Sequence, residues 1–295
     1  MELKDQDIRL TEQLLTIDAE REIEAGARWM RDYLSSTGKS RFVVGLSGGL
    51  DSAVTAMWGA RAIGNQNMIV VRLPYGYIHP SRFAPSVAAS SEDADLVAKR
   101  MEGADYRTID IAPAVDAIAA QMGLADAIEQ AERDGQLPKS LALALGNLKA
   151  RVRATILRTI TNVEDALLLG TGNKTEYLLA YFTTGGDEES DLEILQHYLK
   201  AEVRQLAKAL GVPQRVIDKA PSADLWTGQT DENELGFTYA QADLVLRLTE
   251  GRRDRVIERD GLPGVTPETV RQILDRVDRT AFKRAAKPIF PRYGA

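Results

Sequence analysis

The fold of this chain is decided by the segment Phe42-Val43-Val44-Gly45-Leu46-Ser47-Gly48-Gly49-Leu50-Asp51-Ser52. Its first five residues are apolar without alternation, which is typical of a parallel strand buried on both faces. The paired glycines that follow let backbone N–H groups come close to an anion. A helix is predicted from about residue 52 to residue 63, and its positive N-terminus would point at the same place. The segment therefore predicts a strand, an anion-binding turn and a helix.

The same alternation of strand and helix continues along the chain. Three more strands are predicted at 68–73, 106–111 and 166–170, and further helices at 18–35, 92–101, 113–122, 125–134, 139–161, 174–180 and 192–210. The connections between the predicted strands are long enough to contain helices. This implies an α/β fold with a doubly wound parallel sheet and helices on both faces. No fifth strand is evident, and a helical C-terminal extension is predicted beyond Gly211. We expect residues 1–295 to form a single domain.

Composition excludes several classes of protein. The 295 residues include 37 Lys and Arg against 43 Asp and Glu, for a formal charge of −6, which argues against nucleic acid as a partner. Cysteine is absent, which excludes disulfides, thiolate metal sites and a catalytic thiol. His79 and His197 are too few for a multi-histidine metal site. Neither a membrane span nor a secretory signal is evident, so we expect a cytoplasmic protein with no membrane partner.

Two loops at predicted strand ends carry unusual polar residues. Ligands of parallel sheets bind beyond such ends. Asp51 beside a phosphate would need a cation between them, which predicts a Mg²⁺ ligand, and Glu176 could reach the same cation. The alternative is an ordinary Gly-Gly turn with Ser and Asp as caps, but the complete string directly after an apolar strand favours the anion site. The loop Gly170-Thr171-Gly172-Asn173-Lys174-Thr175 lacks the third Gly of a dinucleotide fingerprint and the spacing of a Walker loop.

Residues 45–52 resemble the pyrophosphate-binding loop of the N-type ATP pyrophosphatases, which cleave ATP between its α and β phosphates and adenylate a carboxylate or a base. Four more strings, in order, narrow the resemblance to the NAD synthetases, specifically the short ammonia-dependent form without a glutaminase domain. They are Val71-Arg72-Leu73-Pro74-Tyr75-Gly76, residues 146–153, residues 170–176 and Lys219-Ala220-Pro221-Ser222-Ala223-Asp224-Leu225. The resemblance runs from about residue 18 to 288 and implies an adenine nucleotide alpha hydrolase-like fold.

This resemblance implies roles for particular residues. ATP would be held by Gly45, Leu46, Ser47, Gly48, Gly49, Leu50, Asp51, Ser52, Thr171, Lys200 and Ser222. The Mg²⁺ cofactor would bind Asp51 and Glu176. Deamido-NAD would contact Arg151, Thr184, Asp191, Phe282 and Lys283. The family often has Lys at the position of Thr184, Asn-Pro at Glu193-Ile194, and His at the position of Phe282.

The implied activity is the last step of NAD biosynthesis. A ligase would use ATP to activate deamido-NAD as an acyl-adenylate, and ammonia would then give NAD; no residue is assigned to covalent catalysis, and a homodimer is implied. Two alternatives are a tRNA-adenylating or tRNA-thiolating enzyme, against which the charge of −6 and the lack of Cys count, and a non-catalytic nucleotide sensor. Without the resemblance, Arg151 would belong to a solvated helix face, and Lys200 would be a mid-helix residue paired at the surface with Glu202 or Glu193.

Overall fold

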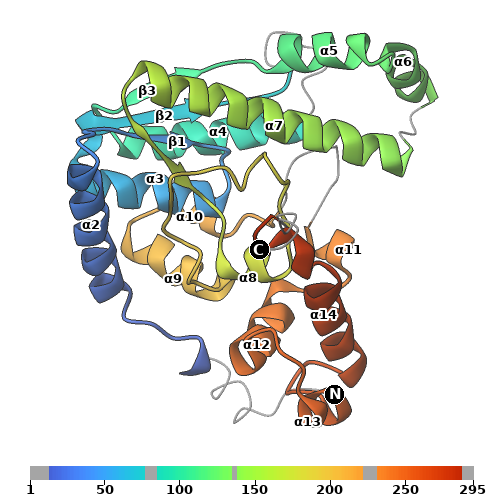
Figure 1. Cartoon of the computed structure of the whole chain (residues 1–295). Helices are drawn as coiled ribbons and strands as arrows, with labels where there is room; N and C mark the ends of the chain where they lie inside the picture. Colours follow the sequence, from blue (N-terminus) through green and yellow to red (C-terminus); the bar gives the residue numbers. More distant parts are fainter. Residues whose placement is uncertain (1–12, 77–84, 135–137, 222–230, 288–295) are drawn as a thin grey trace, which may run out of the picture.

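A five-stranded parallel sheet forms the centre of the computed structural model, which describes residues 13–76, 85–134, 138–221 and 231–287. The strand order is β3-β2-β1-β4-β5, and Figure 1 labels β1, β2 and β3. The strands are β1 (Phe42–Gly45), β2 (Met68–Arg72), β3 (Asp105–Thr108), β4 (Leu167–Gly170) and β5 (Leu192–Glu193). Phe42 is in register with Met68 on one side and with Leu167 on the other. The predicted doubly wound parallel sheet is confirmed.

Successive residues of the central strands enter two separate apolar clusters. In β1, Phe42 and Val44 belong to one cluster and Val43 to the other, and all three are fully buried. The first cluster includes residues of α2 (Ala19–Ser36), α3 (Leu50–Ile63), α4 (Pro85–Arg100), α9 (Lys200–Ala209) and α10 (Gln214–Ile217). The second includes residues of α5 (Ala112–Gln121) and α7 (Lys139–Val163), and α6 (Ala125–Asp134) links these two helices. Because both faces are covered, the central strands β1 and β4 carry no polar side chain, whereas the more exposed β3 includes Asp105 and Arg107.

Helix α2 forms as its sequence predicts. Asp18 caps the helix by accepting the N–H of Arg21 at 3.2 Å. The buried residues are Ile23, Ala27, Met30 and Leu34, spaced three or four apart. The helix therefore lays one apolar stripe on the sheet side of the molecule.

The segment after β4 differs from the prediction, so the helix expected over 192–210 and the absence of a fifth strand were both wrong. Leu192–Glu193 forms β5, parallel to β4, and α9 begins only at Lys200. Leu192, Leu195 and Leu199 are all buried. Their spacing imitates a helical period although the intervening chain is not helical. Two residues of edge strand are also too few to show a period of two.

The C-terminal helices form their own apolar cluster, as the predicted helical extension requires. They are α11 (Asp231–Leu235), α12 (Tyr239–Thr249), α13 (Arg255–Asp260) and α14 (Pro267–Arg279). Leu179, which follows α8 (Lys174–Leu178), and Leu199 join this cluster. Figure 1 shows these orange and red helices below the sheet and beside α8. Over the described parts of the chain, no helix is long and apolar enough to cross a membrane.

Gly48 is predicted to be essential for the turn after β1. Its φ is +80°, and a Cβ there would lie 2.1 Å from the carbonyl oxygen of Ser90 on α4. Gly38 is a matched control, because its φ is +73° but a Cβ would meet nothing within 4 Å. We expect Gly38→Ala to lower the free energy of unfolding by about 1–2 kcal/mol from the left-handed backbone alone. Gly48→Ala should lower it by about 1–3 kcal/mol more, because the backbone of α4 must move. Equal losses in chemical denaturation would contradict this close packing.

Candidate active site

Both predicted loops lie at the point where the strand order reverses. β1 and β4 are neighbours in the sheet, although β2 and β3 come between them in sequence. The segment 46–49 follows β1, and Gly170 ends β4. Open α/β sheets bind their ligands beyond the carboxyl ends of the strands at such a reversal. The two loops therefore flank the position where a ligand is expected.

Two serine hydroxyls hold the first loop in shape. Ser52 Oγ accepts the N–H of Ser47 at 3.2 Å and lies 3.0 Å from Ser47 Oγ, which in turn accepts the N–H of Gly49 at 3.2 Å. Among the described residues, no side chain caps α3 at Gly49, which leaves the N–H groups of its first turn to water or an anion. Leu46 and Leu50 are buried, so they can offer a ligand only backbone groups.

A buried lysine joins the two loops. The Lys200 ammonium lies 3.1 Å from Glu176 Oε1 and forms an ion pair with Asp51. Lys200 is 4% exposed and is the first residue of α9. The alternative interpretation, a mid-helix residue paired at the surface with Glu202 or Glu193, was therefore wrong. The fold instead brings together three predicted site residues from α3, α8 and α9.

The three groups form a charged cluster with an excess of acid. Burial raises the pKa of the Glu176 carboxyl, with Lys200 opposing the rise and Asp51 adding to it. Burial alone would lower the pKa of Lys200, but the carboxylates of Asp51 and Glu176 outweigh it and the pKa is raised. Two carboxylates and one ammonium leave a net charge of −1 when all are ionised. A further cation would thus be attracted to this place.

The donor chemistry of this cluster fits Mg²⁺. This ion usually binds one or two protein carboxylates and completes its shell with phosphate oxygens and water. Asp51 and Glu176 supply two carboxylates, and both already contact one cation, the ammonium of Lys200. Over the described residues, no group of three or more His, Cys, Asp or Glu is placed to hold a metal. Substrate and water would have to provide the remaining ligands.

Polar residues from the C-terminal extension reach the same cluster. The Tyr239 hydroxyl donates to Asp231 Oδ2 at 3.0 Å and lies 3.4 Å from Glu176 Oε1. The Tyr239 ring lies 5.0 Å from the Lys200 ammonium. Sequence reasoning missed both Tyr239 and Asp231. The one available signal in the sequence was that two polar residues of α12, Tyr239 and Asp243, stand four positions apart among apolar ones.

Several residues predicted to contact deamido-NAD lie around the segment 180–191. Arg151 donates from Nε to the Thr184 carbonyl oxygen at 3.2 Å, so the structure brings these two together. Lys283 donates to the carbonyl oxygens of Ala180 (2.9 Å) and Phe182, and Phe282 beside it is 76% exposed. Lys283 therefore anchors the start of this segment.

Both carboxylate oxygens of Asp191 accept a hydrogen bond within the protein. Its Oδ1 accepts from Arg158 at 2.6 Å, and its Oδ2 accepts the N–H of Leu168 at 2.7 Å. Sequence reasoning did not identify Arg158, which also pairs with Glu189. These contacts fasten the segment 180–191 to β4 and α7.

Two predicted ATP contacts remain, Thr171 and Ser222. Thr171 is partly buried, between Gly170 and Gly172. Ser222 lies outside the described residues. Lys219, three positions before it, donates to Ser90 Oγ at 2.8 Å and pairs with Asp93 at 3.1 Å. Because Ser90 touches Gly48, the chain leading to Ser222 starts close to the first loop.

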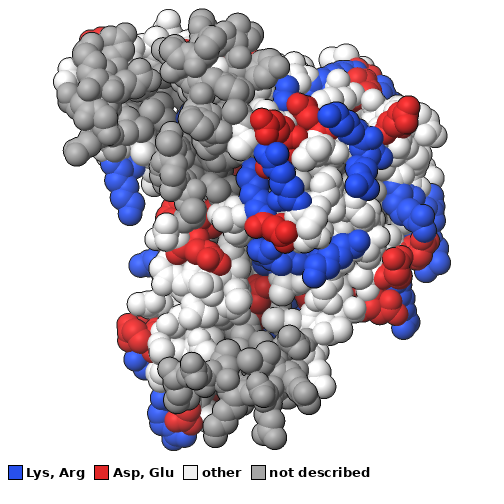
Figure 2. Space-filling view, turned by 180° about the vertical axis from the view of Figure 1, so that it is seen from behind, with Lys and Arg blue, Asp and Glu red and all other residues white. Residues whose placement is uncertain are grey.

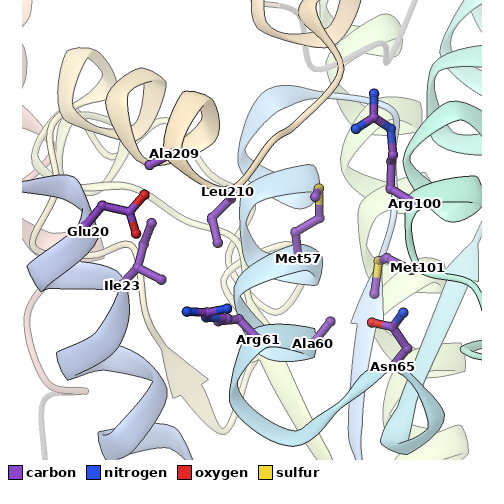
Figure 3. Close-up of a pocket in the computed structure, with 10 residues that line it drawn as sticks. All are labelled: Glu20, Ile23, Met57, Ala60, Arg61, Asn65, Arg100, Met101, Ala209 and Leu210. Atoms are coloured by element: carbon purple, nitrogen blue, oxygen red, sulfur yellow. The ribbon is translucent and has the colours of Figure 1, made fainter.

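A surface pocket of about 350 Å³ lies away from these loops. Its lining includes Met57 and Arg61 from the second half of α3 and Arg100 from the end of α4 (Figure 3). Asp51 precedes Arg61 by ten residues, which at 1.5 Å per residue separates them by about 15 Å along α3. Since no predicted site residue lines this pocket, it is not the candidate active site.

A family model described as NAD synthase matches residues 22–287. The NH(3)-dependent NAD(+) synthetase of Methanosarcina acetivorans is 38% identical over 262 residues, covering 88% of this chain and 94% of that protein. Its counterpart from Thermococcus kodakarensis is 35% identical over 280 residues, covering 94% and 99%.

Solved structures show the same likeness. The NMN synthetase from Francisella tularensis superimposes with a TM-score of 0.74 and 27% identity, covering 94% of this chain and 100% of that one. The NAD+ synthetase from Burkholderia pseudomallei gives a TM-score of 0.65 at 27% identity, covering 95% and 96%.

Glu193 should make stability depend on pH. Its carboxylate accepts from Ser190 Oγ at 2.5 Å, and burial raises its pKa to about 7 from an ordinary value of 4.5. Between about pH 4.5 and 7 the folded state therefore binds more protons than the unfolded state, so the free energy of unfolding falls as pH rises. Glu193→Gln removes this titration. The Tm of the variant relative to wild type should rise from about pH 5 to 7 and then level off.

Thermal unfolding across this pH range checks the Glu193 prediction. Glu20→Gln, an exposed residue of α2, serves as the matched control. A Tm difference for Glu193→Gln that stays constant with pH would show that this carboxyl titrates alike in both states.

Proposed function

Because this chain belongs to the NAD synthase family, whose members are ligases that use ATP, we propose that it converts deamido-NAD and ammonia to NAD with release of AMP and pyrophosphate. The chain is a ligase of NAD biosynthesis that acts by amidation. The finer proposal concerns its substrates, its intermediate and the residues that act.

One observation supports the proposal most directly. Asp51, Glu176 and Lys200 meet at the reversal of strand order, beside a glycine-rich turn and the N-terminus of α3. An ammonium, free N–H groups and two carboxylates able to hold Mg²⁺ suit the leaving pyrophosphate of ATP. Bound there, Mg²⁺ would neutralise negative charge on the phosphates.

We propose two steps. The nicotinate carboxylate attacks the α phosphorus of ATP, so a P–O bond forms to the carboxylate while the α–β bridge breaks and pyrophosphate leaves. Ammonia then attacks the activated carbonyl carbon, a C–N bond forms, AMP leaves and one proton is lost. The first loop and Lys200 would position the phosphates and balance their charge. No protein nucleophile is needed, in agreement with a chain that lacks Cys.

One comparison supports a second candidate substrate, nicotinate mononucleotide. The NMN synthetase from Francisella tularensis matches this fold with a TM-score of 0.74. Nicotinate mononucleotide carries the same nicotinate carboxylate as deamido-NAD but lacks the adenylyl half. The relatives that are 35–38% identical are NAD synthetases, and we therefore put deamido-NAD first.

Further features bear on the alternatives. On the face shown in Figure 2, Lys and Arg gather over one half of the described surface, with Asp and Glu between them. The net charge of −6 supports small-molecule substrates over tRNA. Asp51, Glu176 and Lys200 in mutual contact support catalysis over sensing alone. We also propose, from the family resemblance, a cytoplasmic homodimer in which residues 1–295 act as one domain.

The proposal is tested by incubating the pure chain with ATP, Mg²⁺ and ammonium together with either deamido-NAD or nicotinate mononucleotide. We expect NAD, AMP and pyrophosphate in equal amounts from deamido-NAD, and little amidation of the mononucleotide. Glutamine should not replace ammonium, because the chain holds no Cys. Faster turnover of the mononucleotide would assign the second substrate, and no amide from either would reject the proposal.

Asp51→Ala should reduce kcat by at least about 100-fold, because it removes a carboxylate proposed to hold Mg²⁺ and leaves Lys200 with one partner fewer. Asp32→Ala, on the exposed face of α2, is the matched control and should keep the wild-type rate. Near-normal kcat for Asp51→Ala at saturating Mg²⁺ would refute the metal assignment.

Arg151→Ala should raise KM for deamido-NAD and leave KM for ATP nearly unchanged. A lost charge-assisted hydrogen bond costs about 1.5–3 kcal/mol, or roughly ten- to more than a hundredfold in KM. Steady-state kinetics with each substrate varied in turn provide the measurement. If KM for ATP alone rose, Arg151 would belong to the nucleotide site.

A further inference from the structure

Asp243 is buried in α12 of the C-terminal extension. One of its carboxylate oxygens contacts the segment that carries Glu176, and the other contacts the segment that carries Lys200. Asp243 is only 1% exposed to solvent. Its Oδ1 accepts the hydroxyl proton of Thr175 at 2.5 Å, and its Oδ2 accepts the N–H of Ala201 at 2.7 Å. Thr175 immediately precedes Glu176, and Ala201 immediately follows Lys200.

Thr175 closes this set of contacts. Its Oγ1 accepts the backbone N–H of Lys200 at 3.1 Å while its own proton goes to Asp243. Thr175 is fully buried, so neither of these hydrogen bonds is exposed to solvent. The backbone of α9 and the backbone of α8 are thus tied to each other through one hydroxyl and one carboxylate.

The start of α9 shows why a distant carboxylate is needed. Helices usually begin with a residue whose side chain accepts the free N–H groups of the first turn. Leu199 precedes α9 and has no polar side chain, and it is fully buried in the apolar cluster of the extension. Asp243 supplies the missing acceptor from α12, and its negative charge lies at the positive end of the α9 dipole.

From this geometry we propose that Asp243 is a positioning residue, which fixes Lys200 and Glu176 relative to each other without touching substrate. The inference rests on the proposed function, because it assigns Lys200 and Glu176 to the phosphate site. A displacement of about 1 Å in such groups can cost about a hundredfold in rate. The C-terminal extension is then part of the active-site framework.

Asp243→Asn is the first test. An amide can accept one of the two hydrogen bonds, but its NH₂ group must face either the N–H of Ala201 or the hydroxyl of Thr175. We expect kcat for NAD formation to fall by about 10- to 100-fold, with a smaller change in KM for deamido-NAD.

Thr175→Val removes the hydroxyl while keeping the shape of the side chain. If both residues act through one linkage, Thr175→Val should lower kcat by a similar factor, and the double variant should lose little more than either single variant. Thr175→Ser restores the hydroxyl and should recover most of the loss. Fully additive effects, or a Ser variant as poor as Val, would overturn the proposal.

Thr249→Val separates positioning from general stability. Thr249 is a buried threonine on α12, the helix that carries Asp243, and its hydroxyl donates to the Val245 carbonyl oxygen at 2.8 Å. Thr249→Val should lower Tm like the other variants but leave kcat unchanged. If Asp243→Asn, Thr175→Val and Thr249→Val all lost kcat in the same proportion to their fall in Tm, Asp243 would only stabilise the fold. If Asp243→Asn does not fold, the Thr175 series decides the question.

Binding of Mg²⁺-ATP, measured by titration calorimetry, keeps this inference distinct from the proposed function. Should wild type bind ATP but form no NAD, the proposed function fails, while the role of Asp243 is still read from binding. The proposal then requires weaker ATP binding by Asp243→Asn and Thr175→Val than by Thr249→Val. Equal affinities in all three variants would overturn it.

Discussion

The contact of the Lys200 ammonium with Asp51 and Glu176 is the interaction on which the arrangement of the candidate site depends. A buried cation is tolerated only where acceptors are held in place around it, because removing one partner leaves an uncompensated charge. Here the partners come from α3, α8 and α9, which lie on opposite sides of the strand reversal. The contact of Lys200 with Asp51 and Glu176 thus links the turn after β1 to the turn after β4. The register of the two strands fixes how far apart these turns can be.

Each member of this contact is positioned by a different kind of constraint. Asp51 follows a turn that requires the absence of a side chain at Gly48, since the backbone of α4 occupies that space. Glu176 closes a capping box with Asn173, whose side chain accepts the N–H of Glu176 at 2.9 Å. Lys200 depends on a helix start where Leu199 offers no side-chain acceptor, so that the N–H groups of Lys200 and Ala201 are accepted by Thr175 and Asp243. The site therefore combines steric exclusion, local hydrogen bonding and a contact from a remote helix.

These differences explain how much the sequence could predict. The strand, turn and helix around Gly48 are local in sequence, and their pattern predicts them correctly. The pairing of Lys200 with Asp51 spans 149 positions, so its charge pattern indicated only a surface residue. Asp243 has no motif of its own, and β5 is too short to show a period. Family resemblance supplied Lys200 as a site residue, but its burial and partners required the three-dimensional structure.

The contact between β4 and β5 also bears on how this chain can vary over evolution. A side chain at Gly170 would meet Glu193 Oε1 at 2.1 Å, because the carboxylate fills the space beside the glycine. A residue with a Cβ at position 170 therefore requires the Glu193 carboxylate to leave this space and its contact with Ser190 Oγ. A shorter residue at 193 would make room for alanine at 170 without that movement. The two positions are thus sterically coupled, so lineages that differ at 193 should also differ in what they accept at 170.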